Sequence, residues 1–271
     1  MKNSLLILFV LLFFQNSLTA QKSQLFLLAG QSNAVGQGDS LKSMVCNPNT
    51  AFEFDASGNR FVPLKDPAGK SWKLFQRAAT GSIAPAFAKR LNELSNRSVY
   101  MVTAARGGAS CHRKAEMADF GTWDSCGKLF SLAVEKTKMA EAKAGVSLSG
   151  IIWIQGERDA NAILAGQLSK KEYRQALVSV IQRFRKEFGK KLPFYIIQTA
   201  YQQDKTPEGC QAVRDVQAEV AHTMEAVHIA YRETGEFKER GWFKDIVHYN
   251  QEALNDIGAK TAGFVYKISI N

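Results

Sequence analysis

The sequence lacks the features that mark several large classes of protein. Its 271 residues contain no Gly-X-Y period, no heptad run and only 6 prolines, which excludes a collagen-like chain and a coiled coil. It is not poor in apolar residues either, because a hydrophobic fraction of 45% with mixed charges excludes an intrinsically disordered chain. A globular protein that can bury a sizeable core remains.

A basic stripe is also missing, although the chain is basic overall. Its 35 Lys and Arg residues outnumber its 25 Asp and Glu residues, for a net charge of +10. Such a surplus can indicate a nucleic acid or another polyanion as partner. Here the cations are scattered, with no more than pairs such as Lys170-Lys171, and no stacking aromatics are interleaved with them. We expect a solvated surface and no nucleic-acid partner.

The one long apolar run stands at the start of the chain. Lys2 precedes the uninterrupted run Leu5 to Phe14, and Ala20 offers a small residue at a cleavage point. This order is typical of a secretory signal peptide, and the run is shorter than the about 20 residues that a membrane helix needs. We expect residues 1–20 to be removed and residues 21–271 to form a single secreted or periplasmic domain without stable membrane insertion. An uncleaved anchor or a lipoprotein signal is the alternative.

Cysteine is scarce, with four residues at Cys46, Cys111, Cys126 and Cys210. An even count behind a signal peptide is compatible with disulfides, and three connectivities are possible. We favour Cys111 with Cys126, because this pair would close a short polar loop and stabilise it. His112 beside Cys111 suggests metal ligands, but no second Cys or His follows at ligand spacing, so we expect no metal site.

Short β-branched and aromatic runs recur along the chain and alternate with helical patterns. The runs of strand length are Gln24 to Ala29, Ser98 to Ala104, Ser149 to Gln155, Pro193 to Thr199 and Val227 to Tyr231. Helical spacing of apolar residues predicts helices that begin at Pro85, near Tyr173, near Val213 and after Asn250. Strands joined by long crossovers form a parallel sheet that is covered on both faces. The pattern predicts one doubly wound α/β domain around a central five-stranded parallel sheet.

Two long stretches, Gly36 to Gly81 and Gly107 to Gly127, interrupt this alternation. Both are rich in Gly and polar residues, and both leave the carboxyl end of an expected strand. Ligands of open parallel sheets bind at that edge. The two stretches are therefore candidate walls of a cleft, with plain surface insertions as the alternative.

Polar groups follow the same strand ends. Gly30-Gln31-Ser32-Asn33 comes after the first run, where a Gly allows a sharp turn that presents the Ser hydroxyl and its N–H. Gly107-Gly108 comes after the second, where a backbone N–H can approach a ligand. Gln155-Gly156-Glu157-Arg158-Asp159 comes after the third, and Asp245 stands three residues before His248. A Ser nucleophile, a His base, an acid and oxyanion donors are the parts that acyl transfer requires.

In this order the four blocks resemble the SGNH-hydrolase superfamily, and more narrowly its carbohydrate-esterase branch, which includes acetylxylan esterases and sialate O-acetylesterases. The resemblance runs from about Gln24 to about Val265. It implies a flavodoxin-like three-layer α/β/α sandwich, with Ser32 as the nucleophile and His248 as the general base. The oxyanion donors and substrate-binding residues that it implies, besides the N–H of Ser32, are Gln31, Asn33, Gly108 and Gln155.

Two points stay open at this stage. Asp245 can orient His248 from its own loop, the usual arrangement of the superfamily, whereas Glu157 can do so from across the cleft, as the resemblance to the carbohydrate-esterase branch permits. A second Ser competes as nucleophile, because Gly38-Asp39-Ser40-Leu41 matches the motif after which the superfamily is named. Ser40 lies inside a Gly-rich loop and not at a strand end, so we favour Ser32.

Other His and Trp residues receive mostly structural interpretations. His222 falls in an expected helix and His228 at the start of a strand, whereas His112 is close enough to Gly108 to be a candidate for the cleft. The residues that could form either a platform for sugar stacking or part of the core are Trp123, Trp153 and Trp242.

The motifs together predict a serine esterase that removes acetyl groups from an oligo- or polysaccharide without a metal or organic cofactor. Acetylated hemicellulose, above all xylan, is the first substrate we expect, and O-acetylated sialic acid is the second. A carbohydrate-binding protein that has lost catalysis is the alternative from a different class. Nothing in the sequence indicates the oligomeric state.

Overall fold

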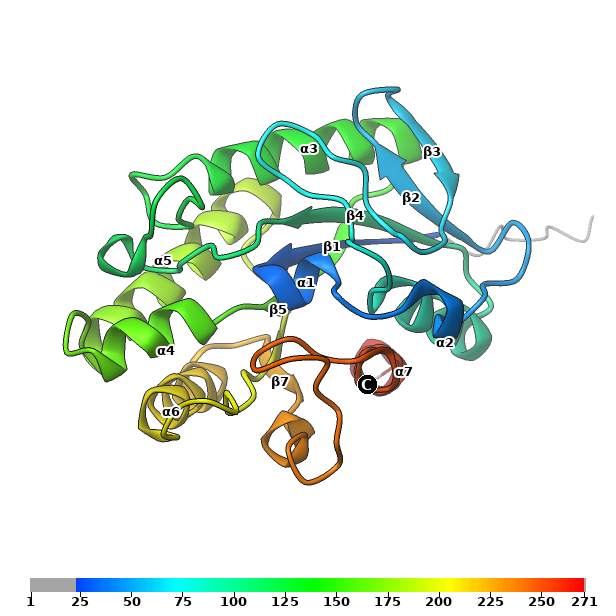
Figure 1. The fold of residues 1–271 in the computed structure, drawn as a ribbon. Helices are drawn as coiled ribbons and strands as arrows, with labels where there is room; N and C mark the ends of the chain where they lie inside the picture. Colours follow the sequence, from blue (N-terminus) through cyan, green and yellow to red (C-terminus); the bar gives the residue numbers. More distant parts are fainter. Residues whose placement is uncertain (1–22, 271) are drawn as a thin grey trace, which may run out of the picture.

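A seven-stranded sheet in the order β3-β2-β4-β1-β5-β6-β7 forms the middle layer of the structure, a computed structural model that describes residues 23–270 (Figure 1). Its strands are β1 (Gln24–Gly30), β2 (Ala51–Asp55), β3 (Arg60–Pro63), β4 (Val99–Ala105), β5 (Leu148–Ile154), β6 (Phe194–Ile197) and β7 (Val227–Tyr231). All neighbouring strands run parallel except β2 and β3, which are antiparallel. The expected signal peptide lies outside the described residues.

All five predicted strands are confirmed, but the predicted number of strands in the sheet is wrong. The two additional strands, β2 and β3, lie within the stretch from Gly36 to Gly81. Its many Gly, Asn and Asp residues hid the short alternating segment that β2 forms at the edge of the sheet. Aromatic contacts hold this edge, since Phe52 stacks on Tyr100 of β4 and Phe61 packs edge-on against the same ring.

Helices cover both faces of the sheet. They are α1 (Ser32–Val35), α2 (Ala84–Ser95), α3 (Leu129–Ala144), α4 (Glu157–Leu164), α5 (Lys170–Phe188), α6 (Glu208–Thr223) and α7 (Gln251–Ile270). Helices α2 and α7 pack against each other and share one core cluster, whereas α3, α5 and α6 contribute to the cluster on the opposite face (Figure 1). The four predicted helices correspond to α2, α5, α6 and α7, and α5 begins with a capping box formed by Ser169 and Glu172. The sequence patterns did not predict α3 and α4.

Strand β1 shows how this packing determines the composition of a strand. Leu25, Leu27 and Ala29 enter one core cluster, whereas Phe26 and Leu28 enter the other. Side chains of a strand alternate between the two faces, so a strand covered on both sides becomes a continuous apolar run. The continuous run in the sequence therefore indicated a central strand.

The carboxyl ends of three central strands meet in register. Gly30 at the end of β1 pairs with Ala105 at the end of β4 on one side and with Ile154 at the end of β5 on the other. The segments that follow these strands consequently leave the sheet side by side. This brings together three of the four polar blocks of the sequence.

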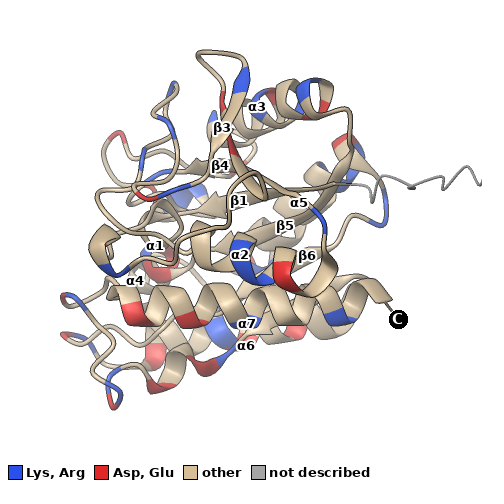
Figure 2. Ribbon diagram, turned by 90° about the vertical axis from the view of Figure 1, so that its right-hand side faces the viewer, with Lys and Arg blue, Asp and Glu red and all other residues tan. Residues whose placement is uncertain are grey.

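Charged residues of both signs are interspersed on the surface, as Figure 2 shows along α6 and α7. Many form ion pairs between neighbouring elements, such as Arg174 with Glu219 and Lys260 with Glu233. Exposed pairs of this kind each contribute little to stability. Within residues 23–270, no helix is both long enough and apolar enough to cross a membrane.

The predicted disulfide between Cys111 and Cys126 is not formed, and all four cysteines are free thiols. Cys111 is fully buried in a core cluster, and its N–H donates to the Asp159 carboxylate, whereas Cys126 is exposed. The sugar-stacking interpretation is wrong for Trp123 and Trp153, which are fully buried and pack edge to face.

Candidate active site

Ser32 lies at the turn that follows β1. Gly30 has φ of 143°, and a Cβ added to it would lie 1.9 Å from the Ile154 carbonyl oxygen, so only glycine fits there. The N–H of Gln31 donates to that carbonyl at 2.9 Å, and Ser32 then begins the short helix α1. The N–H of the first residue of a helix has no acceptor within the helix. Ser32 therefore lies directly after the carboxyl end of β1, as predicted, and its backbone N–H is free.

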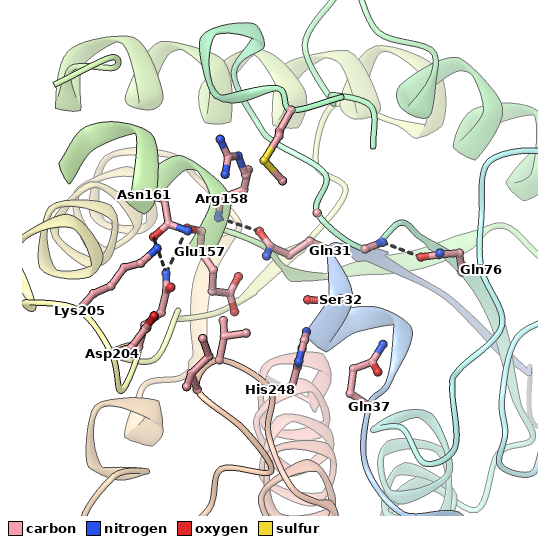
Figure 3. A pocket seen from close by; sticks show the side chains of 16 residues that line it. Gln31, Ser32, Gln37, Gln76, Glu157, Arg158, Asn161, Asp204, Lys205 and His248 are labelled. Carbon is pink, nitrogen blue, oxygen red and sulfur yellow. Dashed lines mark hydrogen bonds between the residues drawn. The ribbon is translucent and has the colours of Figure 1, made fainter. Parts of the chain in front are cut away.

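Asp245 and His248 form a pair within the loop before α7. Nδ1 of His248 lies 2.7 Å from Oδ2 of Asp245, and Oδ1 accepts hydrogen bonds from the N–H groups of Val247 and His248. Partial burial raises the pKa of Asp245, but these hydrogen bonds outweigh it and bring the pKa below its ordinary value. Since Nδ1 is held by an ionised carboxylate, Nε2 remains available to the cavity that His248 shares with Ser32 (Figure 3).

Glu157 lines the cavity but forms no hydrogen bond with the imidazole within residues 23–270. Its Oε1 accepts from Nδ2 of Asn33 at 2.8 Å and from the Tyr249 hydroxyl at 3.4 Å, while Oε2 is buried without a partner among the described residues. Burial raises the pKa of Glu157, against the hydrogen bond from Asn33. Of the two acids considered from the sequence, Asp245 is the one that binds His248 in the structure.

Asn33 connects the turn after β1 with the loop that carries His248. Besides its bond to Glu157, its Nδ2 donates to the Val247 carbonyl at 3.2 Å, and its Oδ1 accepts from the N–H of Tyr249 at 3.2 Å. The side chain is buried and does not line the cavity. The expected substrate contact is therefore absent, because all three hydrogen bonds of this side chain hold protein segments together.

Backbone donors flank Ser32 in the cavity. Gly108 has φ of 73°, and a Cβ there would lie 2.6 Å from the Phe120 ring. The N–H groups of Ser32 and Gly108 have no acceptor within the described part of the chain, whereas that of Gly107 donates to Oε1 of Gln76 at 2.7 Å. Two free N–H groups beside a Ser can stabilise the oxyanion of acyl transfer.

Gln155 does not reach this position. Its Nε2 donates to Oδ2 of Asp159 at 2.5 Å, it is 1% exposed, and it does not line the cavity. The structure does not bring Gln155, the predicted oxyanion donor, into the lining of the cavity, because the chain turns at Gly156, with φ of 153°, and the side-chain amide binds Asp159 of α4. Gln31 does line the cavity, with its Oε1 accepting from the N–H groups of Gly156 and Arg158.

Asp159 is a site residue that the sequence reasoning did not single out. It is fully buried and accepts hydrogen bonds from the N–H groups of Cys111 and His112, at 2.8 and 2.9 Å, as well as from Gln155. Burial raises its pKa to about 6. Through these hydrogen bonds the carboxylate connects the stretch from Gly107 to Gly127 with α4. Its place in the polar block after β5 was the signal that could have revealed it.

The cavity between these residues has a volume of about 430 Å³. Both candidate walls contribute to it, since Gln37 and Gln76 come from the first long stretch and Met117 from the second. Arg158 of the polar block after β5 also lines it, and the lining residues that the sequence did not indicate are Asn161, Gln202, Asp204, Lys205, Ile246 and Val247. His112 and Ser40 lie outside the lining, and His112 instead accepts a hydrogen bond from the N–H of Lys114.

No three His, Cys, Asp or Glu side chains gather within residues 23–270 in a way that could hold a metal ion. Ser32, His248 and Asp245 together with the two free N–H groups are the groups of the cavity that could carry out acyl transfer.

Solved structures share this fold. A protein from Arabidopsis thaliana superposes with a TM-score of 0.67 at 18% identity, covering 91% of this chain and 98% of that one. The crystal structure of NanS gives a TM-score of 0.66 at 15% identity, covering 93% and 98%. A carbohydrate acetylesterase from Xanthomonas citri gives 0.51 at 19% identity, covering 90% of this chain and 56% of that one. A comparison with curated proteins yields no match.

A family model covers nearly the whole described chain. Residues 22–267 match the model described as "Carbohydrate esterase, sialic acid-specific acetylesterase". The resemblance inferred from the four sequence blocks is thereby confirmed at the level of the family. The chain belongs to this family of carbohydrate esterases and is a carboxylic ester hydrolase.

Proposed function

We propose that this protein removes O-acetyl groups from sialic acid through an acyl-enzyme formed on Ser32. One observation supports the mechanism above all others. The cavity contains the Ser32 hydroxyl, a His248 ring held at Nδ1 by Asp245, and the free N–H groups of Ser32 and Gly108. These are the groups that acyl transfer requires, in one place.

In the proposed reaction, Oγ of Ser32 attacks the acetyl carbonyl carbon while Nε2 of His248 takes the hydroxyl proton. The negative charge that develops on the carbonyl oxygen is bound by the N–H groups of Ser32 and Gly108. The ester C–O bond then breaks, and His248 returns the proton to the departing sugar oxygen. His248 then deprotonates a water molecule, which attacks the carbonyl carbon of acetyl-Ser32. The bond from this carbon to Oγ breaks, His248 returns the proton to Oγ, and acetate leaves. Asp245 stabilises the imidazolium in both halves.

The cavity is lined by the carboxylates of Glu157 and Asp204 as well as by two cations, and the cations are the groups that can bind an acidic sugar. Arg158 and Lys205 both line it, and neither forms an ion pair with a carboxylate among the described residues. Nε of Arg158 donates to the Ala115 carbonyl at 2.7 Å, which fixes the guanidinium, and Nζ of Lys205 donates to Oδ1 of Asn161 at 2.8 Å. Sialic acid carries a carboxylate that these cations can bind, whereas the acetylated xylose units of xylan are neutral. The family description points to the same substrate. We therefore place sialic acid before hemicellulose, the reverse of the order expected from the sequence.

Acetate release tests the proposal. The wild-type protein is expected to deacetylate O-acetylated sialic acid with a higher kcat/KM than acetylated xylo-oligosaccharides. Arg158→Gln is expected to lower kcat/KM on the sialic acid by about 10- to 100-fold, since a hydrogen bond to a charged group contributes about 1.5–3 kcal/mol. The same substitution is expected to leave hydrolysis of uncharged p-nitrophenyl acetate near the wild-type rate. Two results would contradict the choice of sialic acid as substrate. They are a preference of the wild type for xylo-oligosaccharides, and a loss in Arg158→Gln that is as large on p-nitrophenyl acetate as on the sialic acid.

We further propose that the protein acts outside the cytoplasm. This rests on the segment up to Ala20 alone. N-terminal sequencing of the protein exported by its own host is expected to begin near Gln21, and a chain that retains Met1 would contradict it.

A further inference from the structure

Two free backbone donors lie beside Ser32, and an oxyanion site can also use a third donor from a side chain. The resemblance to SGNH hydrolases implied that the side chain of Gln155 would supply it. That amide is instead engaged with Asp159 at 2.5 Å and is almost fully buried. A third donor, if the site uses one, has to come from another side chain that lines the cavity beside Gly107 and Gly108.

Gln76 is anchored at this place. It follows the β2–β3 hairpin in the chain, and its N–H donates to the carbonyl of Ala105, the last residue of β4, at 3.1 Å. Its side-chain Oε1 accepts from the N–H of Gly107 at 2.7 Å (Figure 3). Since both the backbone and one end of the carboxamide are held, the orientation of the amide is restricted.

The other end of that amide, Nε2, is a hydrogen-bond donor of a residue that lines the cavity containing Ser32. Nε2 of Gln76 has no acceptor within the described part of the chain, and the residue lines the same cavity as Ser32 and His248. A Cβ added to Gly107 would lie 3.1 Å from Oε1 of Gln76 and 3.9 Å from Cβ of Ser32. Oε1 of Gln76 and Cβ of Ser32 thus both lie near the position that a side chain of residue 107 would occupy, and a glycine leaves that position empty.

We propose that Nε2 of Gln76 is the third donor of the oxyanion site, in the place that the family resemblance gave to Gln155. This inference rests on the proposed acyl transfer at Ser32. A donor whose orientation is fixed before the reaction stabilises the developing charge without a cost of reorganisation. The bond from Gly107 supplies that orientation, because an amide that accepts at oxygen presents its N–H groups elsewhere.

Gln76→Glu separates a donor from a mere anchor. Glutamate has nearly the same shape and keeps an oxygen that can accept from Gly107, but it replaces the N–H donor with an acceptor. We expect kcat on p-nitrophenyl acetate to fall by about 100-fold or more with little change in KM, the loss seen when one oxyanion donor is removed. Gln76→Ala removes both the acceptor for the Gly107 N–H and the Nε2 donor. Its kcat is therefore expected to fall by at least about 100-fold as well.

Gln37→Glu is the matched control, because it places the same charge in the same cavity from a residue that has no hydrogen bond to Gly107. It is expected to lower kcat far less than Gln76→Glu does. Thermal denaturation of each variant tests whether the fold is retained. We expect the Gln76 variants to have midpoints near that of the wild type, because Gln76 is exposed.

Three results would overturn the inference. They are a Gln76→Glu variant whose kcat stays within about threefold of the wild type, a loss confined to KM, and a loss in Gln37→Glu as large as that in Gln76→Glu. Failure of the proposed acyl transfer at Ser32 would give other results. The wild-type protein would then hydrolyse no acetyl ester, or Ser32→Ala would hydrolyse it as well as the wild type does. An active wild type with an active Gln76→Glu variant rejects the third donor alone.

Discussion

Nδ1 of His248 lies 2.7 Å from Oδ2 of Asp245, whereas Glu157 is directed to Asn33 and Tyr249. Two carboxylates near one His therefore have separate positions. Asp245 fixes the ring, and Glu157 lies under the segments that hold Ser32 and His248 together.

Asp245→Asn tests this division. An amide can present its N–H group to Nδ1 and so favour the wrong tautomer of the ring, which has cost about 10⁴-fold in kcat in a well-studied triad. We expect a loss of at least about 100-fold on p-nitrophenyl acetate. Glu157→Gln keeps an acceptor for Asn33 and is expected to lose much less. Equal and small losses in both variants would refute the assignment of Asp245.

Asn33→Ala is expected to damage stability as well as rate. The substitution leaves the Val247 carbonyl and the Tyr249 N–H without their partner, and Oε1 of Glu157 keeps only the 3.4 Å bond from the Tyr249 hydroxyl. Each unsatisfied buried group costs about 1–3 kcal/mol, so the free energy of unfolding should fall by at least this amount. Urea denaturation measures it. A variant with the wild-type unfolding midpoint would show that Asn33 does not connect the two segments.

Asp159 predicts a dependence of stability on pH. Burial raises its pKa from 3.8 to about 6, so the folded state binds this proton more tightly than the unfolded state does. The contribution of Asp159 to the free energy of unfolding should therefore fall as the pH rises from 3.8 to about 6 and stay constant above that range.

The measurement is the difference in unfolding free energy between the wild type and Asp159→Asn at several pH values. Relative to the variant, the wild type should lose stability across this window and not above it. Parallel pH profiles for the two proteins would show that Asp159 has its ordinary pKa.

Gly30→Ala should disrupt the turn that presents Ser32. The added Cβ would lie 1.9 Å from the Ile154 carbonyl oxygen, at a φ of 143° that alanine rarely adopts. We expect loss of esterase activity together with a lower melting temperature. Gly263→Ala in α7 is the control, because nothing lies within 4 Å of its Cβ, and it should be neutral or stabilising. A Gly30→Ala variant as active as Gly263→Ala would argue against this turn.

Features that depend on local patterns were predictable from the sequence. Continuous apolar runs such as Gln24 to Ala29 indicate buried parallel strands, and the polar blocks that follow them indicate one edge of the sheet. These patterns placed Ser32 at that edge, and the order of the four blocks, which resembles that of SGNH hydrolases, added His248 and Asp245 to the same site. The edge strand β2 escaped because its alternation is short and lies within a Gly-rich stretch.

The orientation of individual side chains was not predictable. Gln155 and Gln31 each follow the end of a strand, yet only Gln31 lines the cavity. Gln155 is directed away from the cavity by the turn at Gly156 and by its hydrogen bond to the Asp159 carboxylate. No rule of sequence spacing predicts that hydrogen bond. The same limit applies to Gln76, which a long loop brings beside Gly107.

The central claim is that the acetyl group passes through Ser32. Rapid quenching of the reaction with p-nitrophenyl acetate, followed by peptide mass spectrometry, measures it most directly. The account predicts one acetyl group on the peptide that contains Ser32, no acetylation and no turnover in Ser32→Ala, and normal turnover in Ser40→Ala. Turnover in Ser32→Ala that disappears in Ser40→Ala would contradict it.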